Sequence, residues 1–236
     1  FGHSYRNVSP SNYLKTAFEK EGFPTLMIPN IVEIDQYLFK KREQYSPTIL
    51  YVRAFHQIYN PSMAVRVLFE VKKVYPEAEL CMVGPPKDIS YDETKQLAKD
   101  LGIEDSISYT GVLPKQEWHK LSEDFDVFIN TTTIDNTPVS VMEAMAMGLP
   151  VVSTNVGGIP YLLNDKKDAF LVPHNDEKAM ANAVLDIISG KNEIDKMVVA
   201  ARKKVEKFDW QYVRKSWLPL LKGIPVKRKR DITDYI

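Results

Sequence analysis

The sequence contains a single cysteine, Cys81, so no disulfide can form within the chain. Cys81 lies in the apolar run 78–83, where a thiol usually packs as a small buried side chain. Chains without disulfides are typical of reducing compartments. We therefore expect a buried structural thiol and a cytoplasmic protein.

Long apolar runs and secretion signals are also missing. No stretch approaches the roughly 20 apolar residues that a membrane-spanning helix needs. The start, Phe1-Gly2-His3, has neither the basic nor the apolar region of a secretion signal. Because the chain lacks an initiator Met and soon enters a helical pattern, we expect a piece of a larger protein.

The chain has no surplus of charge of one sign, because 31 Lys and Arg residues balance 31 Asp and Glu residues. A dedicated nucleic-acid-binding protein normally carries a basic surplus, so we expect a small-molecule partner and no nucleic acid. One local basic run, Lys227-Arg228-Lys229-Arg230, is either a solvated tail or a peripheral contact with the anionic inner face of a membrane. With 44% hydrophobic residues, the 236-residue chain can form one sizeable globular domain and a fragment.

Several cofactor motifs do not occur in the sequence. It has no Gly-x-Gly-x-x-Gly fingerprint, no phosphate-binding P-loop and no His/Cys spacing typical of a metal site. The four histidines are scattered along the chain. A general Rossmann-type oxidoreductase is therefore disfavoured, and we expect neither a metal nor another bound cofactor.

What the sequence does contain is an alternation of short apolar runs with longer helical patterns, which is typical of a parallel sheet covered by helices on both faces. The expected strands are 48–52, 79–83, 107–109, 126–130, 150–153 and 169–172. The expected helices between them are 62–74, 93–101, 115–122, 138–147 and 177–188. The predicted fold class is α/β, with a Rossmann-like parallel sheet.

Two further regions flank this block. Upstream, a helix over 11–20 and a short strand over 25–28 precede a polar connection over 29–46. Downstream, helices are expected over 195–207 and 210–221, and the second is amphipathic and aromatic. We divide the chain into a domain remnant (1–30), a linker (31–46), a Rossmann-like nucleotide-binding domain (47–207) and a C-terminal helix with a basic tail (208–236).

The most informative stretch, residues 126–158, reads DVFINTTTIDNTPVSVMEAMAMGLPVVSTNVGG. A buried strand passes through the polar loop 131–137 and enters a helix at Pro138, with Asn136 or Thr137 as its N-cap. The start of this helix should lie at the carboxyl edge of the parallel sheet, where open α/β folds bind their ligands.

The start of this helix has the groups that bind an anion. The unpaired amides of Val139 and Ser140, together with the helix dipole, would favour a phosphate. The Ser140 hydroxyl can add a donor. A phosphate-bearing ligand is therefore expected at this edge of the sheet.

Glu143 is conspicuous because residues 141–142 and 144–146 make its helix apolar on nearly every face. A buried carboxylate is costly without partners. Helical side chains lean toward the N-terminus, so the two oxygens of Glu143 could reach the hydroxyls of a ribose there. Asp135, on the preceding loop, could hold a sugar. A structural alternative is equally open, in which Asp135 caps a turn with Asn136 and Glu143 forms an internal ion pair.

These residues resemble the motifs of glycosyltransferase family 4, whose members are retaining enzymes of the two-domain GT-B fold. The family's Glu-x7-Glu motif is matched by Asp135 and Glu143. Its Ala-Met-Ala-x-Gly-x-Pro-Val-Val stretch and its Gly-Gly-x-Pro loop are matched by residues 144–152 and 157–160. The resemblance extends over roughly residues 8–220 and implies that this chain is the C-terminal, donor-binding half of such an enzyme.

The resemblance also implies roles for residues. Glu143 would bind the ribose and Asp135 would lie near the transferred sugar. The loop Asn136-Thr137-Pro138-Val139-Ser140 would donate to the distal phosphate and the sugar. Gly111-Val112-Leu113 would frame the base, and Gly84 would form the floor of the cleft. The expected donor is a UDP- or GDP-sugar, and the expected acceptor is a glycan or a glycolipid.

The sequence differs from the family motif at the positions of its cationic residues. Tyr51-Val52-Arg53-Ala54-Phe55 stands where the family has a Gly-Arg pair, and Tyr59-Asn60 stands where it has Lys-Gly. We expect Arg53 to stabilise the departing diphosphate, as a cation must when no metal does so. No matching Lys appears, and His56 is the nearest alternative cation, although a lone loop histidine is more often incidental. Asp135 is also one methylene shorter than the family's Glu.

The sequence therefore predicts a retaining, hexosyl-type glycosyltransferase. Cleavage of the anomeric C–O bond would pass through an oxocarbenium-like state, and the acceptor would attack on the leaving-group face. The acceptor domain is expected to be largely missing, so the chain alone should bind donor without turnover. The alternative is a non-catalytic nucleotide-binding or interaction module on the same fold, which the missing Lys and Asp135 favour.

Overall fold

The computed structural model describes residues 4–190 and 193–223. Its centre is a six-stranded sheet in which every pairing is parallel and the strand order is β5-β4-β3-β6-β7-β8. The strands are β3 (Thr48–Val52), β4 (Glu79–Val83), β5 (Ile107–Gly111), β6 (Val127–Asn130), β7 (Val151–Thr154) and β8 (Phe170–Val172). This is the strand order of a Rossmann fold, so the predicted fold class is confirmed.

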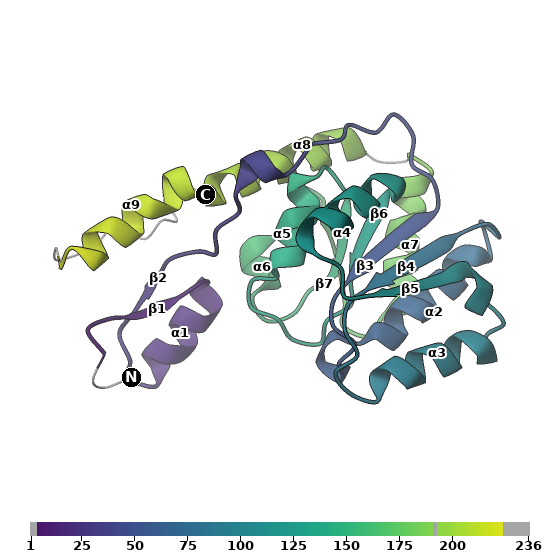
Figure 1. Ribbon diagram of the computed structural model, residues 1–236, viewed down its shortest axis with the longest axis horizontal. Helices are drawn as coiled ribbons and strands as arrows, with labels where there is room; N and C mark the ends of the chain where they lie inside the picture. The colour runs from purple at the N-terminus through teal and green to yellow at the C-terminus, as the bar shows by residue number, and fades with distance from the viewer. Residues whose placement is uncertain (1–3, 191–192, 224–236) are drawn as a thin grey trace.

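Helices cover both faces of the sheet (Figure 1). One face packs against α2 (Pro61–Lys72), α3 (Ser90–Asp100) and α7 (Glu177–Ile188). The other packs against α4 (Lys115–Leu121), α5 (Val139–Ala146) and the short α6 (Ile159–Leu162), while α8 (Ile194–Val205) contributes residues to both cores. Successive strand residues point to opposite faces, so Ile49 and Tyr51 join the first core and Leu50 joins the second. Since both faces are buried, the strands are continuous apolar runs.

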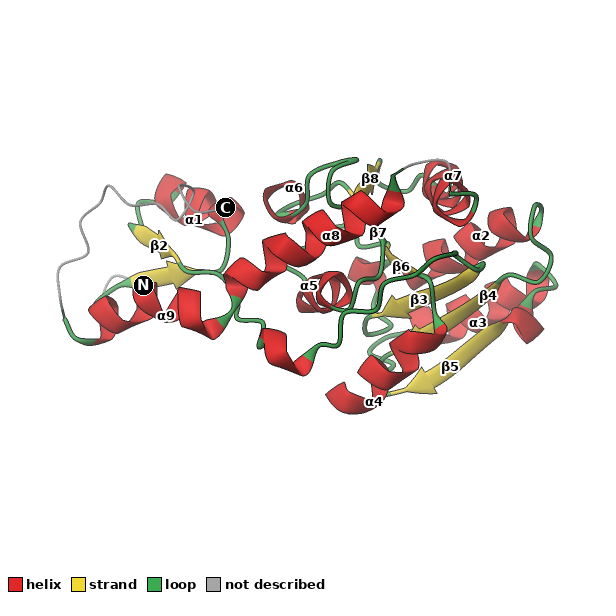
Figure 2. Ribbon diagram, turned by 90° about the horizontal axis from the view of Figure 1, so that it is seen from above, coloured by secondary structure: helices red, strands yellow, loops and turns green. Residues whose placement is uncertain are grey.

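A smaller β-α-β unit precedes this domain. Strand β1 (Asn7–Ser9) pairs in parallel with β2 (Thr25–Met27), and α1 (Asn12–Lys20) connects them. Ser11 caps α1, because its side-chain oxygen accepts a hydrogen bond from the Leu14 amide at 3.2 Å. Figures 1 and 2 show this unit beside the C-terminal helix α9 (Trp210–Leu221), away from the six-stranded sheet.

The connection between the two units is anchored to the larger one. The Tyr37 side chain is buried, and the Val32 amide donates to the Phe208 carbonyl at 3.0 Å. The buried Arg42 side chain forms an ion pair with Asp126 at 2.8 Å. The predicted polar connection therefore contributes to the core of the domain as well as joining two units.

Two further sequence-based expectations concern the interior and the membrane. Cys81 is buried, as predicted, and burial raises the pKa of its thiol. Within residues 4–190 and 193–223, no helix combines the length and apolar character that crossing a bilayer requires. The basic run 227–230 lies outside the described residues.

Candidate functional site

A pocket of about 350 Å³ opens at the carboxyl ends of the central strands. Strands β3 and β6 are neighbours, but β3 leads to β4 on one side and β6 leads to β7 on the other. Such a reversal of strand order is where open α/β folds bind ligands. The pocket is lined by Val52, Arg53, Ala54, Tyr59, Val83, Gly84, Pro85, Val112, Leu113, Trp118 and Ser140. Of the predicted site residues, Arg53, Gly84, Val112, Leu113 and Ser140 are therefore in its wall.

Gly84 lines this pocket, and no larger residue fits at its position. Its φ is +151°, and a Cβ atom would lie 2.0 Å from the Arg53 carbonyl oxygen. The Gly84 amide donates to the Gly111 carbonyl at 2.8 Å. The backbones after β3, β4 and β5 thus meet at close range, which places Arg53 at the base of the pocket.

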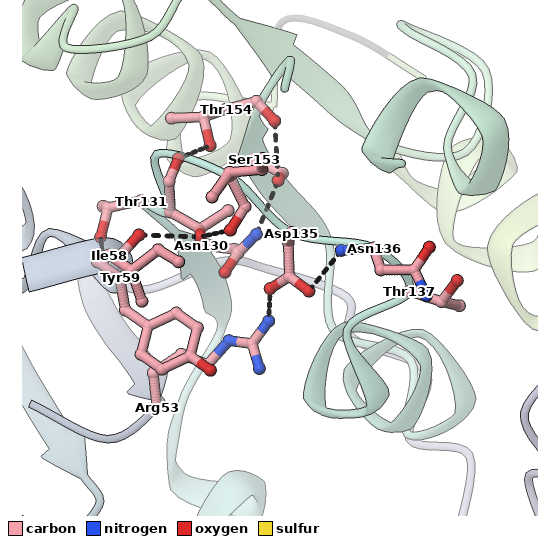
Figure 3. Close-up of polar contacts among 12 residues, drawn as sticks. Arg53, Ile58, Tyr59, Asn130, Thr131, Asp135, Asn136, Thr137, Ser153 and Thr154 are labelled. Atoms are coloured by element: carbon pink, nitrogen blue, oxygen red, sulfur yellow. Dashed lines mark hydrogen bonds and ion pairs between the residues drawn. The ribbon is translucent and has the colours of Figure 1, made fainter. Parts of the chain in front are cut away.

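Arg53 is the only charged side chain among the described residues that line the pocket. Its Nη2 forms an ion pair with Asp135 Oδ2, and its guanidinium lies 4.7 Å from the centre of the Tyr59 ring (Figure 3). Its Nε atom is buried and has no hydrogen-bond partner among the described residues. Burial lowers the pKa of Arg53. The structure thus brings Arg53 and Asp135 together.

The turn that carries Tyr59 is held by three successive threonines. Thr131 Oγ1 donates to the Tyr59 carbonyl at 2.8 Å, while Thr132 and Thr133 donate to the Ile58 carbonyl at 3.1 and 2.9 Å. Asn60 has a left-handed φ of +47°. Asparagine tolerates that conformation better than most residues, which explains how it replaces the glycine of the family motif.

The N-terminus of α5 differs from the prediction in its cap. The helix starts at Val139, and Pro138 is an N-cap without a side-chain hydrogen bond, so the predicted capping by Asn136 or Thr137 is wrong. Asn136 Oδ1 instead accepts from Ser11, and Thr137 Oγ1 donates to the Pro10 carbonyl at 3.4 Å. Both candidate caps are therefore used by the smaller unit.

Ser140 adds a polar group at this helix start. Its hydroxyl is buried, lines the pocket and has no hydrogen-bond partner among the described residues. Together with first-turn amides that no side chain caps, it forms a concentration of unused donors. Such a helix N-terminus favours an anion.

The Gly157-Gly158 pair supports the loop that carries Asp135. A Cβ atom on Gly157 would lie 2.3 Å from the Asp135 carbonyl oxygen, and one on Gly158 would lie 2.0 Å from that of Asn136. The Gly158 amide donates to the Asp135 carbonyl at 2.8 Å. The requirement for glycine here comes from close backbone packing, and its consequence is a fixed position for the Asp135 loop.

Glu143 is buried, with 4% of its surface exposed, and it has two partners. Its Oε1 accepts from the Tyr37 hydroxyl at 2.9 Å and lies 2.8 Å from Lys115 Nζ. Burial and the Glu143 charge raise the pKa of Tyr37, and burial lowers the pKa of the neighbouring His119. Because 58% of the Lys115 side chain is exposed, this cation can swing away from Glu143.

The structural alternative, in which Asp135 caps a turn and Glu143 forms an internal ion pair, is thus partly observed. Asp135 Oδ1 accepts from the Asn136 amide at 2.7 Å, as a turn-capping residue does, and Glu143 has an internal ion pair. Sequence reasoning missed both partners of Glu143. Lys115 had a weak signal, since it begins a helix directly after residues 111–114, whereas Tyr37 had none.

Solved structures with the same fold support this description. The chain of Anabaena Alr3699/HepE in complex with UDP-glucose superposes with a TM-score of 0.84 at 18% identity, covering 93% of this chain and 64% of that one. TarM superposes with a TM-score of 0.79 at 19% identity, covering 90% of this chain and 42% of that one. These neighbours are glycosyltransferases of the GT-B fold, and at this identity they show the fold alone.

Sequence relatives narrow the family. Amylovoran biosynthesis glycosyltransferase AmsK of Erwinia amylovora is 35% identical over 120 residues, which are 48% of this chain and 30% of AmsK. The putative colanic acid biosynthesis glycosyltransferase WcaL of Escherichia coli K12 is 33% identical over 138 residues, 55% of this chain and 34% of WcaL. The matched region is thus about a third of the length of these relatives. The family described as glycosyl transferases group 1 matches residues 34–204, so the chain belongs to that family.

Proposed function

We propose that this chain is the C-terminal, donor-binding half of a retaining glycosyltransferase of family 4. The enzyme would transfer a hexosyl-type sugar from a nucleoside-diphosphate sugar to a glycan or glycolipid acceptor. One observation carries the proposal, namely that a partly buried arginine and the uncapped N-terminus of α5 meet in one pocket at the reversal of strand order. A cation and free amides on one wall are what a diphosphate requires.

Each part of the donor has a counterpart in this proposal. Arg53, the first-turn amides of α5 and the Ser140 hydroxyl would bind the diphosphate. Residues 111–113 would frame the base. Glu143 would accept hydrogen bonds from the ribose hydroxyls once Lys115 moves aside. No metal is part of this proposal.

The chemistry follows from the same placement. The anomeric C–O bond breaks to give an oxocarbenium-like state, and the departing diphosphate is stabilised by Arg53 and the helix amides. The acceptor hydroxyl attacks the anomeric carbon from the face that the diphosphate leaves, which retains the configuration. Its proton passes to the departing phosphate oxygen, so no protein nucleophile is required. The acceptor would be bound outside residues 47–207, and we expect this chain alone to bind donor without turnover.

The relatives indicate a substrate class. AmsK and WcaL are named for amylovoran and colanic acid biosynthesis, which suggests a polysaccharide as the product. HepE was solved with UDP-glucose, which makes a UDP-sugar the first donor to test, with a GDP-sugar as the alternative.

Titration calorimetry of the chain with UDP and with GDP tests the proposal. We expect one of the two to bind, and Glu143→Ala to weaken that binding at least tenfold, the equivalent of one lost hydrogen bond to a charged group. Glu177→Ala is the matched control, because this glutamate lies on α7 and its ion pair with Arg66 is exposed. Each titration is run with EDTA and with Mg²⁺. Binding of neither nucleotide, or equal effects of the two substitutions, would contradict the proposal.

A second candidate is a non-catalytic nucleotide-binding module on the same fold. Two observations favour it, because Tyr59 stands where the family motif has a lysine and Asp135 already neutralises Arg53. The two functions are distinguished by incubating the full-length protein with a panel of nucleotide sugars and detecting products by mass. Nucleotide binding without transfer from any donor would favour the module.

A further inference from the structure

We propose that Asp135 competes with the donor's diphosphate for Arg53, so that arrival of the diphosphate releases the Asp135 carboxylate. This inference rests on the proposed function and adds a positioning step to it. In the described structure the Arg53–Asp135 ion pair is closed (Figure 3). When the donor binds, its diphosphate would replace the Asp135 carboxylate as the anion bound to Arg53.

The charges at the pocket lead to this conclusion. Arg53 is the only charged side chain among the described residues in the pocket wall, and one of its two terminal nitrogens is already bound to Asp135. The side chains of both partners are largely buried, with exposed fractions of 16% and 14%. Separating such a pair without a substitute partner is costly. A diphosphate is a substitute for Asp135, so the pair can open when it binds.

The backbone around the pair is fixed, so the exchange falls to the side chains. Behind Arg53, the Gly84 backbone is in direct contact, and the Arg53 amide donates to the Val83 carbonyl at 3.0 Å. Behind Asp135, Gly157 and Gly158 are packed equally closely. Rotation of the Asp135 carboxylate about its own side-chain bonds is therefore the motion that remains.

Two buried polar atoms, one of them in the pair itself, have no hydrogen-bond partner among the described residues. One is Arg53 Nε, a donor, and the other is Asn130 Oδ1, an acceptor. The Asn130 amide is oriented by its Nδ2, which donates to Ser153 Oγ at 3.0 Å (Figure 3). Buried polar groups without partners are uncommon in folded proteins.

For the reaction, the contact of Arg53 with the diphosphate becomes coupled to the contact of Asp135 with the sugar. While Asp135 is bound to Arg53, its Oδ2 cannot accept a hydrogen bond freely from the sugar. Once the diphosphate occupies Arg53, that oxygen is available to the sugar attached to the same diphosphate. Asp135 would thereby favour an intact nucleotide sugar over the nucleoside diphosphate product.

The test compares UDP and GDP affinities of the wild-type chain and of Asp135→Asn by calorimetry. Asparagine keeps an oxygen for the Asn136 amide but removes the charge that competes for Arg53. We expect Asp135→Asn to bind the preferred nucleoside diphosphate on the order of tenfold more tightly, the equivalent of one partly buried ion pair. Binding of uridine or guanosine, which carry no phosphate, should be unchanged.

Two further variants provide a charge control and a substitute for Asp135→Asn. Asp92→Asn, on the exposed first turn of α3, removes a negative charge that has no contact with Arg53, and it should leave affinity unchanged. Asp135→Ser, whose hydroxyl can also accept from the Asn136 amide, should reproduce the gain if Asp135→Asn does not fold.

The outcomes separate this inference from the proposed function. If the wild type binds a nucleoside diphosphate, Glu143→Ala weakens that binding at least tenfold, and both Asp135 variants bind equally or more weakly, then competition is wrong and the proposed function stands. If Asp92→Asn also increased the affinity for the nucleoside diphosphate, the effect would come from the overall charge of the protein, and the inference would be overturned. If no variant binds either nucleotide, both proposals fail.

Discussion

Arg42 and Arg53 lie at opposite ends of the central strands and are paired very differently. Arg42 lies at the end where β6 begins, and its three guanidinium nitrogens contact Asp126 at 2.8 Å, the Gly148 carbonyl at 2.9 Å and the Phe125 carbonyl at 2.7 Å. Arg53 lies at the end where β3 finishes. It has one ion pair and one aromatic neighbour, and its Nε has no partner among the described residues.

This difference separates a structural cation from one that is available to a ligand. Every nitrogen of Arg42 is used to hold the connecting segment on the domain, so it has nothing to offer a ligand. At the other edge, Arg53 and Ser140 both retain unused donor capacity beside a pocket. Buried polar groups are normally satisfied by the fold, so unpartnered donors beside a pocket are candidates for binding a ligand.

The largest expected effect is on stability, from Arg42→Met. Removing the guanidinium leaves Asp126 and two buried carbonyls without their partner, so we expect the free energy of unfolding to fall by about 3–5 kcal/mol. Urea denaturation followed by circular dichroism measures this loss. Arg66→Met is the control, because the Arg66–Glu177 pair is exposed and 3.9 Å long, and it should cost less than about 1 kcal/mol.

For Arg53→Met we expect a larger effect on ligand affinity and a smaller effect on the free energy of unfolding than for Arg42→Met. We expect UDP or GDP affinity to fall roughly 10- to 100-fold, since a charged hydrogen-bond donor to the diphosphate is lost. The free energy of unfolding should fall by about 2 kcal/mol, less than for Arg42→Met, because Arg53 forms one ion pair whereas Arg42 also holds the Gly148 and Phe125 carbonyls. Calorimetry and urea denaturation of the same samples give both numbers. Equal stability losses for the two arginines would break the comparison.

The variant Thr132→Val tests whether the turn that carries Tyr59 positions Arg53. The fully buried Thr132 hydroxyl contacts the Ile58 carbonyl at 3.1 Å and the Ile134 carbonyl at 2.8 Å, and valine keeps its shape. We expect a loss of about 1 kcal/mol in unfolding free energy, together with weaker nucleotide binding. Thr133→Val, at a more exposed position, serves as the control and should cost less. Unchanged binding in Thr132→Val would show that the turn carrying Tyr59 does not position Arg53.

The smallest expected effect is a pH dependence from His119, which packs against Tyr37 with ring centroids 4.7 Å apart. Burial lowers the pKa of His119, so the folded state binds its proton less readily than the unfolded state does. The resulting stabilisation is fully present above about pH 6.5 and is lost as the pH falls toward the lowered pKa.

His119→Gln should therefore flatten the decline in unfolding free energy between about pH 7 and pH 5. Urea denaturation at several pH values measures this slope. His174→Gln, which removes an exposed histidine, controls for the loss of a histidine. An unchanged slope in His119→Gln would show that this partly buried ring does not contribute to the acid sensitivity of the protein.

The sequence predicted the parts of the fold that depend on local pattern. The bounds of β3, β4, α7 and α9 agree residue for residue with the expected ranges, because apolar periodicity marks where these elements begin and end. Strand β1 and helix α6 were missed, since three or four residues are too few to show a period. The cap of α5 was wrong because Ser11, the partner of Asn136, is 125 positions away in the sequence.

The candidate site shows the same division. Five of the eleven described residues that line the pocket were named in advance, namely Arg53, Gly84, Val112, Leu113 and Ser140. Their partners were not. Arg53 meets Asp135 across 82 positions, and Tyr37 meets Glu143 across 106.

The sequence by itself determined the order of strands and helices along the chain and the two-sided burial of the sheet. Hydrophobic pattern and backbone preference carry that information within short windows. Only the tertiary structure decided which charges are paired, because β3 and β6 become neighbours through the strand order of the sheet. Whether an arginine supports the fold or remains available to a ligand depends on that neighbourhood, since a buried charge is stabilised by whatever the surrounding elements place beside it.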